Sequence, residues 1–566
     1  MKTRTWVLAL CVFLANVILL WHFHDRYWYP TDDGLYAHLA ERLLNGEVLN
    51  VDIQDIHPGY IHFLHAAAFR IFGSDMVSLR YPLMLAAFVQ GCFVFALLQR
   101  RHVVFAALGS IAITALGVLQ FYDPTANWYC LCLCVVLACW LVWLPAFHPL
   151  RLVGAGILVG VLTLFRQLTG AWVMMAVLVL ALLEYSTDGR GRRVLLSRAL
   201  VATMLAAVIG YLALSPETEP GGVLLIAIWP MAILAWMLVN TRTTNSSVVV
   251  FFAQLTLGIA IPAAPLVLYD IIHGSFGGWI NDTVLAAFGE TQMPFFGRGW
   301  YGVLSFAGLY QAVSSRDAVK IANGLYWGVL PLISTANGIL ILRRLCRQTG
   351  NDELQLPILA AFYALVSLYL EGPLYLYYTA GLSLIAVLWL LAPGSRANQI
   401  LGAVTVSGLI VVAVVFHAGQ SRLRTPSEIL QGVRVSSVWT GRGEGLVRCH
   451  LGLDQMDHDV YSRLVDVIER ESRAGDSIFA VPNDAELYFL ASRRNPFRFY
   501  NTALGVRTAA ELRHVIDELI THPPRLVTFR PDDKYNTDAS RQVMKLVRSK
   551  YDRIRTIGGL EIYRLR

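Results

Sequence analysis

The stretch Pro30-Thr31-Asp32-Asp33-Gly34-Leu35-Tyr36 directly follows the first hydrophobic segment of the chain. Its two adjacent carboxylates stand where a helix is expected to begin, with Thr31 or Asp32 as the N-cap and Asn45-Gly46 as the end. One face of this helix would carry Leu35, Leu39, Leu43 and Leu44. The stretch therefore predicts a short amphipathic helix lying on the membrane surface, with its carboxylates at the height of the lipid headgroups.

A second stretch, Asp55-Ile56-His57-Pro58-Gly59-Tyr60, predicts another short helix in the same polar segment. Pro58 would occupy its first helical position and Gly73 would end it, which is the usual placing of these residue types. His57 would then stand at a helix start, where a protonated imidazole suits a phosphate. The two helices would thus place carboxylates and an imidazole where a lipid-linked phosphate would lie.

The composition is that of a multi-span membrane protein. The 566 residues are 56% hydrophobic and 15% charged, whereas soluble domains carry about 25% charged residues. The formal charge of +7 does not indicate nucleic-acid binding, because the basic residues cluster in loops between apolar segments. Residues 6–21 have the character of a signal peptide, but no small-residue cleavage site follows, which predicts a retained first span.

Hydropathy predicts about thirteen membrane-spanning helices. The predicted spans are residues 5–22, 79–98, 103–121, 128–146, 152–165, 169–184, 198–215, 222–239, 247–270, 322–342, 355–371, 374–392 and 398–416. The pair 152–165 and 169–184 is interrupted by Arg166-Gln167. Two connecting segments on the outer side are long, residues 23–78 and 271–321, and the second is rich in Gly and aromatic residues.

The charges of the loops orient these spans. Loops expected in the cytoplasm contain Arg100, Arg101, Arg151, Arg190, Arg192, Arg193, Arg242, Arg343, Arg344, Arg347 and Arg396. Loops expected outside contain Asp123, Glu217, Glu219 and Glu371. Because basic residues favour cytoplasmic loops, this alternation predicts a cytoplasmic N-terminus and a C-terminus on the outer side.

A change in composition near residue 421 divides the chain into a transmembrane domain, residues 1–420, and a soluble domain, residues 421–566. The soluble part predicts helices at 457–474, 508–521 and 536–550 and strands at 477–481 and 525–529, with one or two closing strands over 554–565. Strands alternating with helices indicate a small α/β domain. It carries no Gly-rich phosphate loop, so we interpret it as a structural or docking module rather than a second active site.

Asp32 and Asp33 have two interpretations. They could cap a helix and stabilise its first turn through the helix dipole. Alternatively, one of them could be a general base that takes the proton of an acceptor hydroxyl, which suits a reaction whose phosphate leaving group needs no protonation. On the second interpretation, the phosphate would be bound by His57, Arg80 and Arg166.

Each of these cations also has an ordinary alternative. His57 could be a polar residue at a helix boundary, and Arg80 could be an interfacial anchor at the outer end of the second span. Arg166 interrupts an apolar run, where charges are costly and mark functional sites, although it would be unremarkable if the break is a loop. The remaining candidates for a substrate cavity on the outer side are Tyr36, Tyr60, Asp123, Asn127, Gln167, Arg298, Glu371 and Tyr377.

The sequence predicts no metal ligands and no cofactor, with a divalent metal ion left open. Cys130, Cys132, Cys134 and Cys139 fall within one predicted helix at spacings that do not converge on a site. No internal repeat is evident, which disfavours a transporter built from inverted halves.

The chain resembles the GT-C class of glycosyltransferases, membrane enzymes that move a sugar from a polyprenyl-phosphate carrier to an acceptor on the outer side. It looks most like the bacterial branch with the protein O-mannosyltransferases and the lipid A aminoarabinose transferases. Residues 32–37 match its Asp-Glu-x-x-Tyr-Ala pattern with Asp in place of Glu, and His57-Pro58 falls where that branch often has Lys-Pro. Phe72-Gly73 followed by Arg80 matches its Phe-Gly…Arg ending. The resemblance is clear over residues 1–170, general in hydropathy to 420 and loose beyond.

The resemblance implies an inverting glycosyltransferase in the bacterial inner membrane, using a polyprenyl-phosphate sugar and a lipid, glycan or protein acceptor. Asp32 would be its catalytic base, and members of this branch are often metal-independent. Two alternatives are a lipid or polysaccharide transporter or flippase without transferase activity, and an envelope scaffold that presents the C-terminal domain. A transporter would predict charges near the bilayer midplane, and a scaffold leaves the placement of Asp32, Asp33 and Arg166 unexplained.

Overall fold

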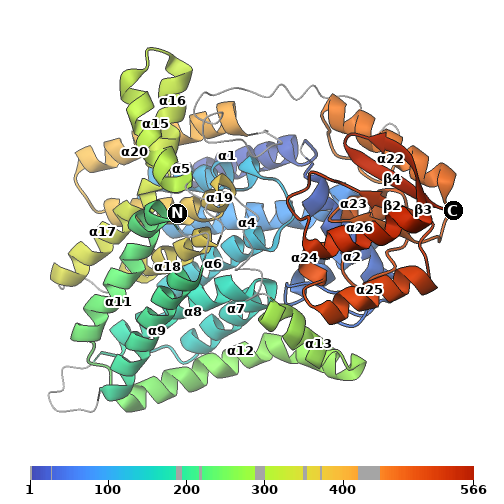
Figure 1. Cartoon of the computed structure of the whole chain (residues 1–566). Coiled ribbons are helices and arrows are strands. Elements are labelled where there is room, and N and C mark those ends of the chain that lie inside the picture. Colours follow the sequence, from blue (N-terminus) through green and yellow to red (C-terminus); the bar gives the residue numbers. More distant parts are fainter. Residues whose placement is uncertain are drawn as a thin grey trace.

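The computed structural model describes residues 3–26, 28–186, 194–215, 219–286, 300–347, 353–369, 372–418 and 446–566. Figure 1 shows a bundle of long helices with a smaller C-terminal domain, coloured orange to red, packed against one of its ends over α2. The predicted domain boundary at residue 420 lies outside the described residues.

Ten helices within these ranges are long and apolar enough to cross a bilayer, which makes the chain a multi-pass membrane protein. They are built on α1 (Thr3–Phe23), α4 (Arg80–Leu98), α5 (Val103–Ala115), α6 (Ala126–Trp143), α8 (Gln167–Glu184), α9 (Leu195–Leu214), α11 (Ile228–Asn240), α12 (Asn245–His273), α19 (Pro373–Leu391) and α20 (Arg396–Val412). Side chains such as Trp6, Leu10 and Leu257 are exposed on their outer surfaces, as expected for contact with lipid.

Three of the predicted spans have a different form. α16 (Ala318–Val329) and α17 (Leu332–Arg347) together make one candidate span that is bent by 40°. The helices α7 (Arg151–Phe165) and α18 (Gln355–Tyr363), the latter extended by η6 (Ala364–Leu368), are apolar but shorter than a full span. All thirteen predicted segments thus fall on helices, whereas ten, or eleven with the bent pair, meet the length expected of a span.

The backbones of α7 and α12 touch because glycines face each other. A Cβ on Gly156 would lie 2.4 Å from the carbonyl oxygen of Leu255, and one on Gly258 would lie 2.2 Å from that of Val153. Small residues at such crossings are typical of packed membrane helices. This contact fixes α12 beside the polar segment, where the Tyr60 hydroxyl donates to the Pro262 carbonyl at 2.6 Å.

The first of the two predicted short helices, α2 (Pro30–Leu44), starts earlier than predicted. Its N-cap is Tyr29, and neither Thr31 nor Asp32 caps it, so that expectation is wrong. Proline suits the first helical position because its φ is already fixed, and the Asp33 carboxylate accepts the Tyr29 backbone N–H at 2.8 Å. The predicted end is confirmed, with Asn45 as C-cap and Gly46 at a φ of +89°.

The second of these helices, α3 (Tyr60–Phe72), starts later than predicted and ends at Gly73 as expected. Pro58 is not its first residue, because Gly59 turns the chain with a φ of +134° and serves as the N-cap. His57 therefore lies in the α2–α3 loop and not at a helix start.

The segment 271–321, predicted as a long outer loop, contains helices. They are α13 (Phe276–Ile280), η4 (Asn281–Leu285), α15 (Trp300–Ser314) and the first residues of α16. In Figure 1, α15 and α16 lie side by side and project from the bundle. Their outer face exposes Phe306, Tyr310 and Val313, so this segment is an apolar helical hairpin rather than an irregular loop.

The C-terminal domain has the predicted mixture of strands and helices. Its elements are α22 (Gln455–Glu471), β1 (Ile478–Val481), α23 (Ala485–Leu490), α24 (Thr502–Gly505), α25 (Ala509–Thr521), β2 (Leu526–Phe529), α26 (Asp538–Lys550), β3 (Tyr551–Ile557) and β4 (Leu560–Leu565). The sheet order is β1-β2-β4-β3, with β1 parallel to β2 and the other pairs antiparallel. Only the short helices α23 and α24 were not expected from the sequence.

The domain shares a hydrophobic core with the bundle. Tyr488 and Phe489 of α23 belong to the same buried cluster as Phe69 of α3, and the rings of Phe69 and Phe489 stack at 5.6 Å. α23 also packs directly on α2 at Gly34, where an added Cβ would lie 2.2 Å from Cβ of Glu486. The docked domain therefore holds α2 in place.

Candidate active site

The two adjacent carboxylates of α2 have different environments. Asp33 is fully buried, and the Nη2 group of Arg80 donates to its two oxygens at 2.8 and 2.7 Å. Arg80 is also fully buried and donates through Nη1 to the carbonyl of His24 at 3.2 Å. The structure thus joins α2 to α4 through a buried ion pair, a placement that favours a positioning role for Arg80 over direct contact with a phosphate.

Asp32, by contrast, is exposed to solvent although protein surrounds it closely. The surrounding protein and the neighbouring Asp33 carboxylate raise the pKa of Asp32 to about 6, while Lys534 and His57 oppose that shift. A carboxyl group with solvent access and a pKa near neutrality can take a proton from a hydroxyl group and release it again. Asp32 and Asp33 therefore differ in exposure and in charged partner.

Asp123 adds a third carboxylate to this region. It follows η2 (Val118–Gln120), is 1% exposed, and its Oδ1 has no hydrogen-bond partner among the described residues. Burial, together with the charges of Asp33 and Asp32, raises the pKa of Asp123 well above its ordinary value. Asp123 therefore lies buried within interaction range of both carboxylates of α2.

Arg166 and its partners form a second polar group at the same end of the bundle. Arg166 lies between α7 and α8 and donates to Asn127 Oδ1 at 2.5 Å and to the Tyr375 hydroxyl at 3.1 Å. Its guanidinium also packs over the ring of Tyr369, 5.0 Å from the centroid. The break that the sequence predicted is therefore real, and it brings a cation, an amide and two phenol rings together.

The side chain of Gln167 bridges two segments. Its amide nitrogen donates to the carbonyl of Ile56 at 2.9 Å and to that of Thr283 at 2.8 Å. Ile56 belongs to the α2–α3 loop and Thr283 to η4, so Gln167 supports the loop that carries His57. Gln167 was predicted to line the substrate cavity. In the structure its side chain holds two backbone segments together.

The structure brings only some of the other predicted cavity residues close to Asp32. Tyr36 is buried one turn after Asp32, with its ring 6.3 Å from His57 and 5.0 Å from His65. Tyr377 faces Trp327 instead, with the ring centroids 5.8 Å apart, and its neighbour Tyr378 is the one within electrostatic range of Asp32. Arg298 and Glu371 lie outside the described residues.

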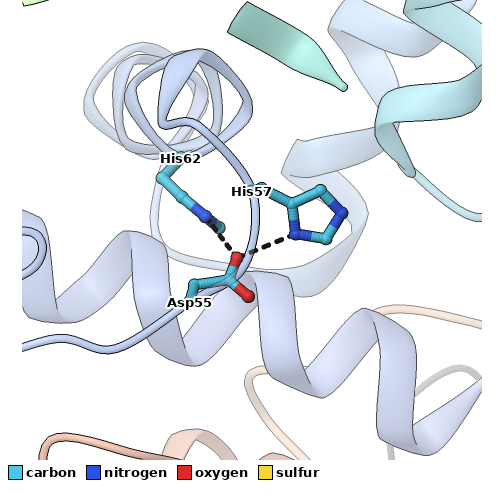
Figure 2. Close-up of side chains that lie close together, drawn as sticks. All are labelled: Asp55, His57 and His62. Atoms are coloured by element: carbon cyan, nitrogen blue, oxygen red, sulfur yellow. Dashed lines mark hydrogen bonds and ion pairs between the residues drawn. The ribbon is translucent and has the colours of Figure 1, made fainter. Parts of the chain in front are cut away.

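The sequence missed a cluster of Asp55, His57 and His62 (Figure 2). Oδ2 of Asp55 lies 2.8 Å from Nδ1 of His57 and 2.6 Å from Nε2 of His62. Burial alone would raise the pKa of Asp55, but the two facing imidazoles hold it well below its usual range. The three ligand-type atoms lie within 4.8 Å of one another, so these residues could hold a metal ion. The spacing Asp-x-His-x4-His was the available signal.

The C-terminal domain contacts this same region. Arg498 Nη2 lies 2.6 Å from Oδ2 of Asp282, and the backbone N–H of Gln54 donates to the Arg498 carbonyl at 2.7 Å. Lys534, exposed in the turn after β2, interacts electrostatically with Asp32. These contacts join the domain to the α2–α3 loop and to η4, and Lys534 adds a cation that no sequence pattern had singled out.

Ion pairs between other helices involve a different set of residues. Arg101 and Arg344 share the carboxylate of Glu353, and Arg151 pairs with Glu184 at 2.6 Å. These arginines come from the loops that the charge pattern assigned to the cytoplasm.

Comparisons with known proteins gave few matches. No protein-family model and no curated protein matches the chain. Among solved structures, two crystal structures of ArnT from Cupriavidus metallidurans align with 100% of this chain and 98% of that chain, each with a TM-score of 0.40. The sequence identity is 13% for the structure bound to undecaprenyl phosphate and 11% for the apo structure.

Proposed function

We propose that the protein is an inverting glycosyltransferase that moves a sugar from a polyprenyl-phosphate carrier to an acceptor hydroxyl on the outer side of the membrane. The observation that carries the proposal is the contrast between Asp32 and Asp33. Asp33 forms an ion pair with Arg80. Asp32 is exposed, has a raised pKa and interacts electrostatically with the cation Lys534. Only Asp32 of this pair is placed to act as a base.

The chemistry follows from these groups. The acceptor oxygen attacks the anomeric carbon, and Asp32 takes the hydroxyl proton as the new carbon–oxygen bond forms. The bond between the anomeric carbon and the phosphate oxygen breaks, and its electron pair stays on the phosphate. A single in-line displacement of this kind inverts the anomeric configuration.

The phosphate gains negative charge in this step, so fixed positive groups should stabilise the transition state. Arg166 and Lys534 are the candidates, and Arg166 is held in place by Asn127 and Tyr375. Arg80 acts indirectly in this account, because its ion pair with Asp33 fixes the turn of α2 that presents Asp32.

The resemblance of residues 32–37 and of His57-Pro58 to the GT-C pattern supports the same donor class. The charge pattern of the loops supports a position of Asp32 on the outer side of the membrane, and the resemblance supports a bacterial inner membrane. The acceptor is then a lipid, glycan or protein of the cell envelope.

The test is the lipid that the purified protein retains. Asp32→Asn protein extracted in mild detergent should carry an intact polyprenyl-phosphate sugar, seen by mass spectrometry of its bound lipids. Wild-type protein given acceptor should carry polyprenyl phosphate instead. A transporter would show no such difference between the two proteins, and absence of any polyprenyl lipid from both would contradict the proposed donor.

A further inference from the structure

The cluster of Asp55, His57 and His62 is built from two adjoining pieces of chain. Asp55 and His57 lie in the α2–α3 loop, and His62 follows in the first turn of α3. Figure 2 shows both imidazoles directed at the same carboxylate from different sides. The side chains of Asp55 and His62 are fully buried, and that of His57 is 17% exposed, so the cluster has one open edge.

The buried imidazole of His62 is only partly satisfied by its neighbours. Its Nδ1 is buried and has no partner in the described structure. Its Nε2 faces Asp55 Oδ2 at 2.6 Å as one member of an ion pair. Buried polar atoms are nearly always satisfied, and three ligand-type atoms within 4.8 Å of one another are close enough to hold one metal ion.

The geometry points to a divalent transition-metal site formed by Asp55 Oδ2, His57 Nδ1 and His62 Nε2, whose open coordination position takes the phosphate of the lipid-linked donor. Two imidazoles and one carboxylate suit Zn²⁺, Mn²⁺ or Fe²⁺, and a site with three protein ligands keeps a position for water or substrate. This inference rests on the proposed function for the identity of the ligand, but the site itself does not depend on it.

The position of the cluster agrees with such a role. The ring of His57 lies 6.3 Å from that of Tyr36, one turn beyond Asp32 on α2, and His57 is within electrostatic range of Asp32. When the anomeric carbon–oxygen bond breaks, the electron pair moves to a phosphate oxygen, and a bound cation there would stabilise the added charge. The proton still goes to Asp32, and no oxidation or reduction takes place.

The supporting contacts hold the ligands in place. Asp55 Oδ1 accepts the backbone N–H of Ile56 at 2.8 Å and lies 3.5 Å from the Tyr500 hydroxyl of the C-terminal domain. The Gln167 side chain fixes the carbonyl of Ile56 between the two loop ligands. Such outer contacts orient metal ligands and tune their affinity.

The first experiment measures metal directly. Wild-type protein is purified without chelators and without a histidine tag, and is then dialysed against Zn²⁺ at the same molar concentration as the protein. It should retain one zinc ion per protein molecule, measured by elemental mass spectrometry. His62→Gln and Asp55→Asn should both lose it. His65→Gln is the matched control, since His65 lies on the same helix with its ring against Tyr36 and should leave the equivalent in place. An empty wild-type site, or equal metal in wild type and His62→Gln, overturns the inference.

The second experiment asks what the open position takes. Co²⁺-substituted protein should change its visible absorption when polyprenyl phosphate is added, and less or not at all with inorganic phosphate at the same concentration. An equal response to both would assign the position to free phosphate, and no response to either would leave a metal site without a donor role; either result overturns the donor-phosphate inference. Neither result bears on Asp32, whose role is tested by the retained lipid, so the two proposals fail separately.

Discussion

Replacing Asp33 with Asn should destabilise the protein strongly, although the new side chain has the same size. In the folded protein Asp33 receives two hydrogen bonds from Arg80, and both side chains are fully buried. Asn keeps an acceptor for the Tyr29 N–H but removes the charge, which leaves the Arg80 guanidinium without its ion-pair partner. Removing one member of a buried pair costs about 3–5 kcal/mol. Since Asp123 also interacts electrostatically with Arg80, we expect a value near the lower end of that range.

The assay is the free energy of unfolding in mixed micelles, followed by tryptophan fluorescence. Asp32→Asn is the matched control, because it is the same substitution at the neighbouring, exposed residue and should change stability little. The double variant Asp33→Asn/Arg80→Gln should recover part of the loss, since it removes the isolated charge. Equal stability of Asp33→Asn and wild type would refute the assignment of Asp33 to a buried ion pair.

Three further predictions concern residues around the site. Gly34→Ala should loosen the docking of the C-terminal domain, because the added Cβ would lie 2.2 Å from Glu486 Cβ. Backbone hydrogen exchange in α2 and α23 should become faster, and unchanged exchange would contradict this prediction. Burial and Asp484 raise the pKa of Glu486 to about 8 from an ordinary 4.5, so the folded protein keeps a proton that the unfolded chain releases, and stability should fall as pH rises through this window. Glu486→Gln should make the melting temperature depend less steeply on pH there, and an unchanged slope would count against the buried neutral acid. Arg166→Ala should weaken donor binding about 10- to 150-fold, as expected for the loss of a charged hydrogen-bonding partner worth about 1.5–3 kcal/mol; unchanged donor affinity in a folded variant would make Arg166 structural.

Much of the fold could be predicted because its signals are local. The apolar segments fall on helices, and the C-terminal strands and helices agree with the sequence pattern to within a few residues. The starts of α2 and α3 could not be placed, because they depend on Asp33 reaching back to Tyr29 and on the positive φ of Gly59. The helix α15 was missed because its Gly- and aromatic-rich sequence favours a loop, although it packs against α16.

The candidate site was predictable in part. The sequence pattern predicted that several polar residues lie on one side of the membrane. In the structure some of these residues contact one another, such as Asp33 with Arg80 and Arg166 with Asn127. The cluster of Asp55, His57 and His62 was missed because it is formed by a turn in the α2–α3 loop. Such a turn has no helical or strand periodicity from which the position of the side chains could be predicted. Lys534 could not be found at all, because its approach to Asp32 depends on how a distant domain docks. The roles of these residues are still proposals.

The central claim is that Asp32 is the base, and the most direct measurement is the rate of sugar transfer by Asp32→Asn with a defined polyprenyl-phosphate sugar and acceptor. If Asp32 is the base, this rate should fall about 10²–10⁴-fold, the contribution typical of a placed base, with donor binding and stability close to wild type. Wild-type transfer should also rise with pH through about 6, the pKa of Asp32, because the base must be ionised. Full activity of Asp32→Asn would contradict the claim, and a comparable loss of turnover confined to a stable Asp33→Asn would move the role to the neighbouring carboxylate.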